Sequence, residues 1–229
     1  MTKTNGDTVR LVVINAGVSD PSSTRMLAER IAQRSVERLG DFGKTATISM
    51  IDLAPLATDI AQAMVAGFSN DVVNKALQKV AGADALIAAT PVYKAGLSGL
   101  FKSFVDLMDN DLLIARPMVL AATAGSARHA MVLDDQMRPL FAFMRALPVP
   151  TSIFAAPEDW SATELGRRID RAGAELASFV AAGVGQAIAG KAWGSYQHQF
   201  GSSAARTEQG NDQVDFDTDL MRLATGGAA

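Results

Sequence analysis

Short runs of apolar, often β-branched residues alternate along the chain with longer segments whose apolar residues recur every three or four positions. The short runs predict strands over residues 9–16, 46–53, 84–90, 116–123 and 149–155. They are apolar on both faces, as expected of strands buried between helices in a parallel sheet. The longer segments predict helices over 23–39, 70–81, 98–108, 130–147 and 161–188.

This strict alternation of strand and helix predicts an α/β protein. With right-handed crossovers it gives a doubly wound, three-layer sandwich, and five parallel strands favour the order 2-1-3-4-5. A ligand of such a sheet binds outside the carboxyl ends of the strands, beside strands 1 and 3. The loops that follow these strands are therefore where functional residues are expected.

The composition indicates one folded domain followed by a tail. The chain has 229 residues and a mass of 24.0 kDa, with 48% hydrophobic and 20% charged residues, close to globular averages. Beyond Gly190 the content of Gly, Ser, Gln and Asp rises and the helical spacing stops. We therefore expect a domain over 1–190 and a tail over 191–229 that is partly mobile or docks on a neighbouring subunit. Large apolar residues in the tail favour some docking: Trp193, Tyr196, Phe200, Phe216, Leu220 and Leu223, with Asp215 as a candidate helix cap.

Charge and cysteine content exclude several functions. A formal net charge of -3 and a pI near 5.4 give no electrostatic footprint for nucleic acid or an anionic membrane. The chain has no cysteine, which excludes disulfides, iron–sulfur clusters and thiolate metal sites, and no metal site is predicted. Redox chemistry must then come from a bound cofactor.

No targeting or spanning segment is expected. The first residues, MTKTNGDTVR, contain no apolar stretch of signal-peptide length. The longest uncharged segment, 176–190, is shorter than the roughly twenty residues that a bilayer span needs. We expect a cytoplasmic protein.

The loop after the first strand is rich in hydroxyl side chains and leads into a predicted helix. Ser19, Ser22, Ser23 and Thr24 provide four of them. Backbone N–H groups at a helix start, together with such hydroxyls, bind phosphate oxygens, and the helix dipole favours the negative charge. A helix cap alone is the alternative, but a cap needs only one hydroxyl. We favour a phosphate site.

The familiar nucleotide motifs are absent. The first loop lacks GxGxxG, and the segment 185–191 only imitates a P-loop, since Ala192 stands where Ser or Thr must bind magnesium. A response regulator is also disfavoured, because strand 3 ends in Thr90 and Pro91 where a phosphoacceptor Asp is needed. A mononucleotide is the better prediction.

The loops after strands 3 and 4 resemble a known family. TPVYKAGLSGLFKSFVDLMD, starting at Thr90, is similar to the segment that binds the isoalloxazine ring in NADPH-dependent FMN reductases, particularly those that serve two-component monooxygenases. TAGSARHAMVLDDQMRPL, starting at Thr123, resembles their third flavin loop and the following helix. With the Ser-rich loop, the resemblance covers about residues 9–155 and implies a flavodoxin-like fold.

Carried onto this sequence, the resemblance implies a set of cofactor-binding residues. Those for the FMN phosphate are Ser19, Ser22, Ser23, Thr24 and Arg25; those for the ring and ribityl chain are Pro91, Val92, Tyr93 and Lys94; those for the pyrimidine edge are Thr123, Ala124, Gly125 and Ser126. Backbone N–H groups near that edge would stabilise the negative charge of reduced flavin. No side-chain acid or base is required, because the protein chiefly orients the flavin and the nicotinamide.

Three further polar residues have open roles. Lys94 and Arg128 are either solvated surface charges or attract the 2′-phosphate of NADPH. His129 opens a predicted helix, where it either packs structurally or lies near the flavin, and Arg128 and His129 are the only catalytic candidates.

Leu97 departs from the family pattern. Members that serve sulfonate monooxygenases often carry an aromatic residue there, at an interface associated with a π-bulge in the third helix. Leu97 argues against such a bulge, and we hypothesise that FMN is held firmly, as a prosthetic group.

The predicted helix over 98–108 carries a broad apolar stripe. It contains Leu100, Phe101, Phe104, Leu107 and Met108. Corresponding helices pair between subunits in flavodoxin-like reductases, so the resemblance implies a homodimer or a homotetramer. An intramolecular core helix is the alternative.

The resemblance implies an NAD(P)H:FMN oxidoreductase that transfers hydride from NADPH or NADH to FMN and supplies reduced flavin to a monooxygenase. Two alternatives stay open: a quinone or azo reductase with firmly bound FMN, and a non-enzymatic flavodoxin-like electron carrier. The mild net charge counts against a carrier, because docking of redox partners favours a strongly one-signed face.

Overall fold

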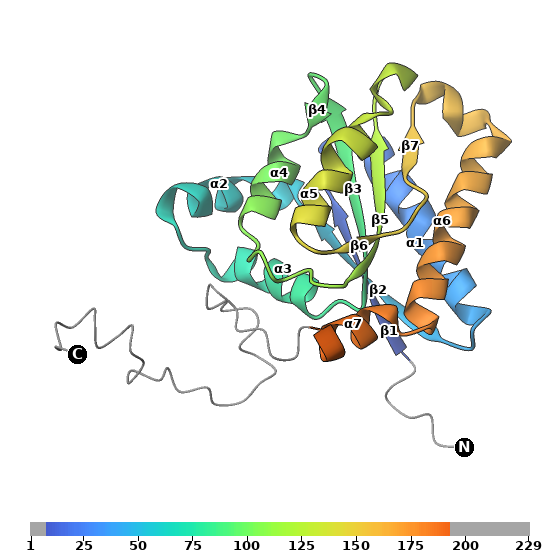
Figure 1. Cartoon of the computed structure of the whole chain (residues 1–229). Helices are drawn as coiled ribbons and strands as arrows, with labels where there is room; N and C mark the ends of the chain where they lie inside the picture. The colour runs from blue at the N-terminus through green and yellow to red at the C-terminus, as the bar shows by residue number, and fades with distance from the viewer. Residues whose placement is uncertain (1–7, 193–229) are drawn as a thin grey trace, which may run out of the picture.

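The computed structural model describes residues 8–192 and contains one seven-stranded sheet (Figure 1). Its path is β2-β1-β3-β5-β6, while β4 pairs with β3 and β7 pairs with β5. The four long strands are parallel: β1 (Thr8–Asn15), β2 (Thr45–Asp52), β3 (Ala85–Tyr93) and β5 (Pro117–Thr123). This order confirms the predicted flavodoxin-like α/β fold.

The predicted fifth strand is divided into two short pieces. They are β6 (Leu147–Pro148) and β7 (Ile153–Ala155), both parallel to β5. Pro150 lies between the two pieces and cannot donate a ladder hydrogen bond, in agreement with the interruption there. The remaining strand, β4 (Gly96–Leu97), was not predicted from the sequence. It is short and pairs antiparallel with the end of β3.

Helices cover both faces of the sheet, because adjacent strand residues point to opposite sides. Leu11 and Val13 of β1 pack in a core with α1 (Ser23–Gly40) and α6 (Thr163–Ala181). Val12 and Ile14 pack in a second core on the other face. The helices there are α3 (Asp71–Ala81), α4 (Gly99–Asp106) and α5 (Arg138–Phe143), with α2 (Ala57–Ala66) at the margin (Figure 1). The result is the expected three-layer sandwich.

Helix α2 was not predicted from the sequence. It follows a single 3-10 turn, η1 (Ala54–Leu56), and only Ile60 and Ala63 are buried in it. With such a narrow buried face, the apolar spacing gives a weak helical signal.

The helix predicted over 130–147 is broken into different elements. A 3-10 turn, η2 (Ala127–His129), is followed by a π-helix, η3 (Leu133–Met137), and then by α5. The helical run ends at Phe143, and Arg145 has a positive φ of 57° before β6 begins. A helical period alone does not distinguish an α-helix from this mixture.

The predicted helix over 161–188 is also divided. A 3-10 turn, η4 (Pro157–Ser161), precedes α6, and α7 (Val184–Ala192) follows at an angle of 44°. The P-loop-like segment lies within α7, so it forms no phosphate loop. A Cβ at Gly185 would lie 2.5 Å from the Ala115 carbonyl oxygen, so α7 rests directly on the chain that enters β5.

In the described part of the chain, no single helix is long and apolar enough to cross a membrane. Only α6 and α7 taken together, across their bend, reach that length and composition. The tail residues singled out above, from Trp193 to Leu223, and the other histidine, His198, lie outside the described residues.

Candidate functional site

The loops after β1, β3 and β5 share one edge of the sheet. These strands are neighbours and parallel, and they point to the top of Figure 1, where β4 and the segment after β5 project. The register places Asn15 beside Ala89, and Pro91 beside Thr123. The residues predicted to bind FMN are therefore brought to one edge.

The β1–α1 loop is held by its own residues. The buried Asn15 side chain accepts a hydrogen bond from the Gly17 N–H at 3.0 Å and donates one to Asp52 at 2.9 Å. Ser22 is the N-cap of α1, and its hydroxyl accepts from the Arg25 N–H at 3.2 Å. A Cβ on Gly17 would lie 2.0 Å from the Ser22 hydroxyl, so only glycine fits this close approach.

The predicted phosphate residues occupy different environments. Ser19 and Ser23 are exposed at the start of α1, whereas Thr24 is buried. The Thr24 hydroxyl lies 2.7 Å from the Thr123 hydroxyl, across 99 positions of sequence. This differs from the expectation that the Thr24 hydroxyl faces a ligand, because here it joins α1 to the end of β5.

Arg25 is also engaged within the protein. Its guanidinium donates to Glu29 at 2.8 Å and to Asp52 at 2.6 Å. The hydrogen bond to Glu29, followed by the nearby Asp52 carboxylate, raises the pKa of Arg25 above its ordinary value. The positive charge of Arg25 is therefore paired with the carboxylates of Glu29 and Asp52.

A hairpin turn extends β3 beyond the sheet. Tyr93 pairs with Gly96, and the two intervening residues, Lys94 and Ala95, have positive φ values of 51° and 64°. At the base of the hairpin, the buried Thr90 hydroxyl accepts from the Ser98 N–H at 3.3 Å. Tyr93 itself is 50% exposed, so its ring is available to a ligand at this edge.

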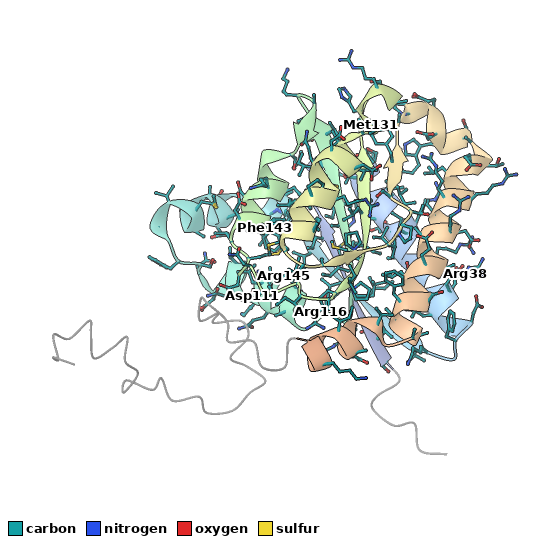
Figure 2. All side chains as sticks on the ribbon, viewed as in Figure 1. Arg38, Asp111, Arg116, Met131, Phe143 and Arg145 are labelled. Atoms are coloured by element: carbon teal, nitrogen blue, oxygen red, sulfur yellow. The ribbon has the colours of Figure 1, made fainter. Side chains whose placement is uncertain are left out.

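The segment after β5 forms the other side of the edge. Thr123 and Ala124 are buried or half-buried, whereas Gly125 is exposed and a Cβ there would meet nothing within 4 Å. Arg128 donates from Nε to Nε2 of His129 at 3.3 Å, so these two side chains pair with each other. Figure 2 shows Met131, 59% exposed, at this same end of the molecule.

Gln136 connects this segment to the hairpin. Its side-chain oxygen accepts from the Leu97 N–H at 3.2 Å, and its amide donates to the Ala95 carbonyl at 3.1 Å. The three loops are thus joined by side chains, the first to the third through Thr24 and Thr123 and the second to the third through Gln136.

Sequence reasoning did not single out Asn15, Asp52 or Gln136. Asn15 and Asp52 carry a recognisable signal, since each is a polar residue that ends an apolar strand at the carboxyl edge. Gln136 carries none, because it is one of several polar residues on a helix and its partners lie 39 and 41 positions away.

The helix predicted over 98–108, which the structure has as α4, uses most of its apolar residues within the chain and not for a subunit contact. Phe101, Phe104 and Met108 of the expected stripe are buried in the core, and Phe101 meets Phe141 edge-to-face at 6.2 Å. Only Leu100 and Leu107 remain half-buried. Most of the stripe is thereby used within the chain.

The expectation based on Leu97 is confirmed for the helix that it concerned. Leu97 lies in β4, and the helix that follows, α4, is a regular α-helix without a π-bulge. A π-helix is present elsewhere, in η3, the segment that carries Gln136. That FMN is held firmly stays a prediction.

The opposite edge of the sheet has a different character. Figure 2 shows Asp111, Arg116 and Arg145 there, and Arg145 pairs with Asp111 at 2.9 Å. A hollow of about 850 Å³ lies between α3 and the chain after α4, away from the three loops. Neither feature brings together the predicted site residues.

Sequence comparison identifies related proteins. The NADPH-dependent FMN reductase family matches residues 9–161. The NADH-dependent FMN reductase SfnE of Pseudomonas putida is 38% identical over 148 residues, covering 65% of this chain and 77% of that protein. An NADPH-dependent FMN reductase of Pseudomonas aeruginosa is 32% identical over 153 residues, covering 66% and 78%.

Solved structures agree with these relatives. An oxidoreductase from Corynebacterium diphtheriae superposes with a TM-score of 0.74 at 42% identity, covering 76% of this chain and 98% of that one. The apo form of the NADH:FMN oxidoreductase EmoB gives 0.65 at 27% identity, covering 74% and 89%. The family match spans β1 to β7 and all three loops at the carboxyl edge. The chain belongs to the NADPH-dependent FMN reductase family.

Proposed function

We propose that this protein is an NAD(P)H:FMN oxidoreductase that supplies reduced flavin to a monooxygenase. The observation that carries the proposal is the joining of the three loops at the carboxyl edge by the Thr24–Thr123 and Gln136 contacts. A helix N-terminus, an exposed aromatic residue and a Gly-containing turn thus follow neighbouring strands at one edge of the sheet, which supports a site for a mononucleotide with a flat ring. Family membership supports the same reaction.

The FMN phosphate is assigned to the start of α1. Ser22 already accepts a hydrogen bond as the N-cap, but a hydroxyl also has a hydrogen to donate. Ser19 in the preceding loop and Ser23 at the first position of α1 are both exposed and would add two more hydroxyls. Thr24 would contribute its backbone N–H and the helix dipole would favour the charge, while Arg25 would act from its position beside Asp52.

The ring and ribityl chain are assigned to the space between the other two loops. Pro91, Val92, Tyr93 and Lys94 would border one side, and Thr123, Ala124, Gly125 and Ser126 the pyrimidine edge. Bound FMN supplies the ring that accepts a hydride from the nicotinamide. The protein's part is to orient the two rings, exclude water and offer backbone N–H groups.

The nicotinamide cofactor would approach the exposed side of this edge. Lys94 and Arg128 are both exposed there, and we assign them the 2′-phosphate of NADPH. Relatives are named for NADH as well as for NADPH, so NADH stays the alternative. His129, half-buried beside Arg128, would orient that guanidinium without transferring a proton itself.

The proposal also includes the assembly and location of the protein: a homodimer or homotetramer, a cytoplasmic location and a partner monooxygenase. Within the chain, it divides residues 1–190, the reductase domain, from the tail 191–229. The half-buried Leu100 of α4 and Leu107, which follows its last residue, support a subunit contact, although the large aromatic residues of α4 are used in the core.

The phosphate assignment is tested by placing a negative charge at Ser23. Asp at the first turn of a helix is favourable for the helix dipole, so Ser23→Asp is expected to keep the melting temperature. It should weaken FMN binding at least about thirtyfold, corresponding to ~2 kcal/mol, by repulsion of the phosphate. Riboflavin, which lacks the phosphate, should bind both proteins equally in fluorescence titrations.

Ser161→Asp, at another exposed serine before a helix, is the matched control and should bind FMN like the parent. Equal losses for FMN and riboflavin in Ser23→Asp would contradict the phosphate assignment.

The activity is tested by following NADPH oxidation under air, with and without added FMN, after recording the flavin absorbance. A rate that requires FMN and saturates with it supports the reductase and makes flavin a substrate. A yellow protein that turns over rapidly only with a quinone or azo dye would instead be an acceptor reductase. Tight FMN binding without oxidation would leave an electron carrier.

A further inference from the structure

The turn between β3 and β4 uses a backbone conformation that its residues do not favour. Lys94 and Ala95 are the two loop residues of the hairpin, and both have positive φ. Two-residue hairpin loops with this geometry prefer Asn-Gly or Gly-Gly, because residues with a Cβ are strained there. The sequence of the turn therefore does not select its conformation.

Gln136 supplies the missing constraint from outside the hairpin. Its amide group bonds to both sides of the turn, donating to the Ala95 carbonyl and accepting from the Leu97 N–H. Its oxygen also lies 3.4 Å from the position of a Cβ on Gly96. A planar amide that satisfies one donor and one acceptor fixes the position of the turn in two directions.

The helix that carries Gln136 is itself firmly anchored. Leu133 and Met137 of η3 are buried in the core. Arg138, the next residue, donates to the carbonyls of Val149 and Pro150 and to the Ser152 hydroxyl. Gln136 thus projects from a fixed platform toward a turn of unfavourable conformation.

We propose that Gln136 is a positioning residue that holds the Tyr93–Gly96 turn against the segment after β5, so that both walls of the flavin ring site move as one unit. The inference rests on the proposed function, because the ring is assigned to these walls. Gln136 does not itself touch the flavin in this proposal. It acts through the turn, which carries Tyr93 and Lys94 at the exposed end of β3.

The test begins with Gln136→Leu, which removes both hydrogen bonds and keeps most of the side-chain volume. Gln136 is exposed, so the melting temperature should stay within about two degrees of the parent. FMN affinity, measured by flavin fluorescence, should fall about five- to tenfold. Gln33→Leu is the matched control, since Gln33 is an exposed helical glutamine whose side-chain amide donates to Glu37 on the same helix.

Two local measurements separate positioning from general stability. Amide hydrogen exchange at Leu97 should accelerate in Gln136→Leu, whereas exchange at the central strand residue Val119 should not change. Gln136→Glu keeps an acceptor for the Leu97 N–H but places an oxygen opposite the Ala95 carbonyl. Because the two oxygens repel each other, this variant should lose at least as much affinity as the leucine variant although it keeps one hydrogen bond.

The decisive variant is Ala95→Gly, which removes the strain of a positive φ at one of the two turn residues and leaves it at Lys94. The backbone carbonyl of residue 95, the partner of Gln136, is retained. In the Ala95→Gly background, Gln136→Leu should reduce FMN affinity by a smaller factor than in the parent, because the turn depends less on the external constraint.

Two results would overturn the proposal. One is FMN binding by Gln136→Leu within twofold of the parent, and the other is an undiminished loss in the Ala95→Gly background. Failure of the proposed function looks different, because Ser23→Asp would then bind FMN and riboflavin as the parent does. If Ser23→Asp loses FMN selectively while Gln136→Leu does not, only the role of Gln136 is wrong.

Discussion

The β1–α1 loop and the β3–β4 turn lie at the same edge of the sheet, to which FMN is assigned above, but are organised in opposite ways. In the first loop, Gly17 bonds Asn15 two positions away and Ser22 caps a helix three positions on. In the turn, Lys94 and Ala95 take an unfavourable conformation and depend on Gln136, 41 positions from Ala95. One wall of the site is specified locally and the other is specified by tertiary contact.

The difference shows which segments around a ligand site can keep their conformation when neighbouring elements shift. A locally organised loop keeps its shape wherever its own few residues are kept. The conformation of a turn that is held by a distant residue depends on the relative position of two elements, here β3 and η3. Such a turn therefore changes its conformation when these two elements shift.

Gly17→Ala should have the largest effect. The new Cβ would displace the Ser22 hydroxyl, 2.0 Å away, and would press on Asn15 and Thr24 at 3.1 Å. Loss of the cap and overpacking together should lower the free energy of unfolding by about 2–4 kcal/mol. FMN affinity should fall more than tenfold, since the loop that faces the phosphate is distorted; urea unfolding and fluorescence titration measure the two effects.

Gly166→Ala serves as the control. Gly166 lies within helix α6, and a Cβ added there would meet nothing within 4 Å. This variant should leave stability unchanged or raise it by up to about 1 kcal/mol. A Gly17→Ala protein as stable as the Gly166 variant would mean that the loop is more adaptable than its contacts imply.

Thr24→Val should have an intermediate effect that depends on Thr123. The single variant leaves the buried Thr123 hydroxyl without its partner, which lowers stability by about 1–3 kcal/mol. The double variant Thr24→Val/Thr123→Val removes both hydroxyls and should be no less stable than the single one. A double-mutant cycle by urea unfolding measures this coupling, and strictly additive losses would show that the two loops are not joined through this contact.

Ser22→Ala should have the smallest effect on stability, about 1 kcal/mol for a lost N-cap. Asn70→Ala removes the N-cap of α3, whose oxygen accepts from the Val72 and Val73 N–H groups, and should lower stability similarly. Only Ser22→Ala should also weaken FMN binding, by a few-fold, because Asn70 lies outside the three loops. Equal FMN affinities in calorimetric titrations of both variants would remove Ser22 from the phosphate site.

The sequence predicted the parts of the site that follow from local pattern. The strands and the positions of the three loops followed from apolar runs such as 9–16 and 84–90, because buried parallel strands are recognised from local pattern. The strand order followed from the alternation of strands and helices with right-handed crossovers. The cap at Ser22 was the alternative considered for the hydroxyl cluster, and the structure has it.

The remaining features depend on contacts between distant residues. The burial of Thr24 against Thr123 requires knowing how α1 lies on the sheet, and the expected helix over 130–147 gave no sign of the π-helix or of Gln136. Helix α2 was missed because only Ile60 and Ala63 mark its buried face. These features are set by packing, which periodicity does not encode.

The packing of α7 at the amino edge of the sheet has a practical consequence for immobilising the protein on a surface or fusing it to another domain. The described chain enters at Thr8, the amino end of β1, and α7 rests on Ala115 at the same edge, so both ends of the described chain leave from the side opposite the three loops (Figure 1). A tether joined directly at Thr8 or at Ala192 would therefore lie opposite the edge to which FMN is assigned. An electrode surface or an oxygenase domain joined at these residues would leave the proposed approach of NAD(P)H open.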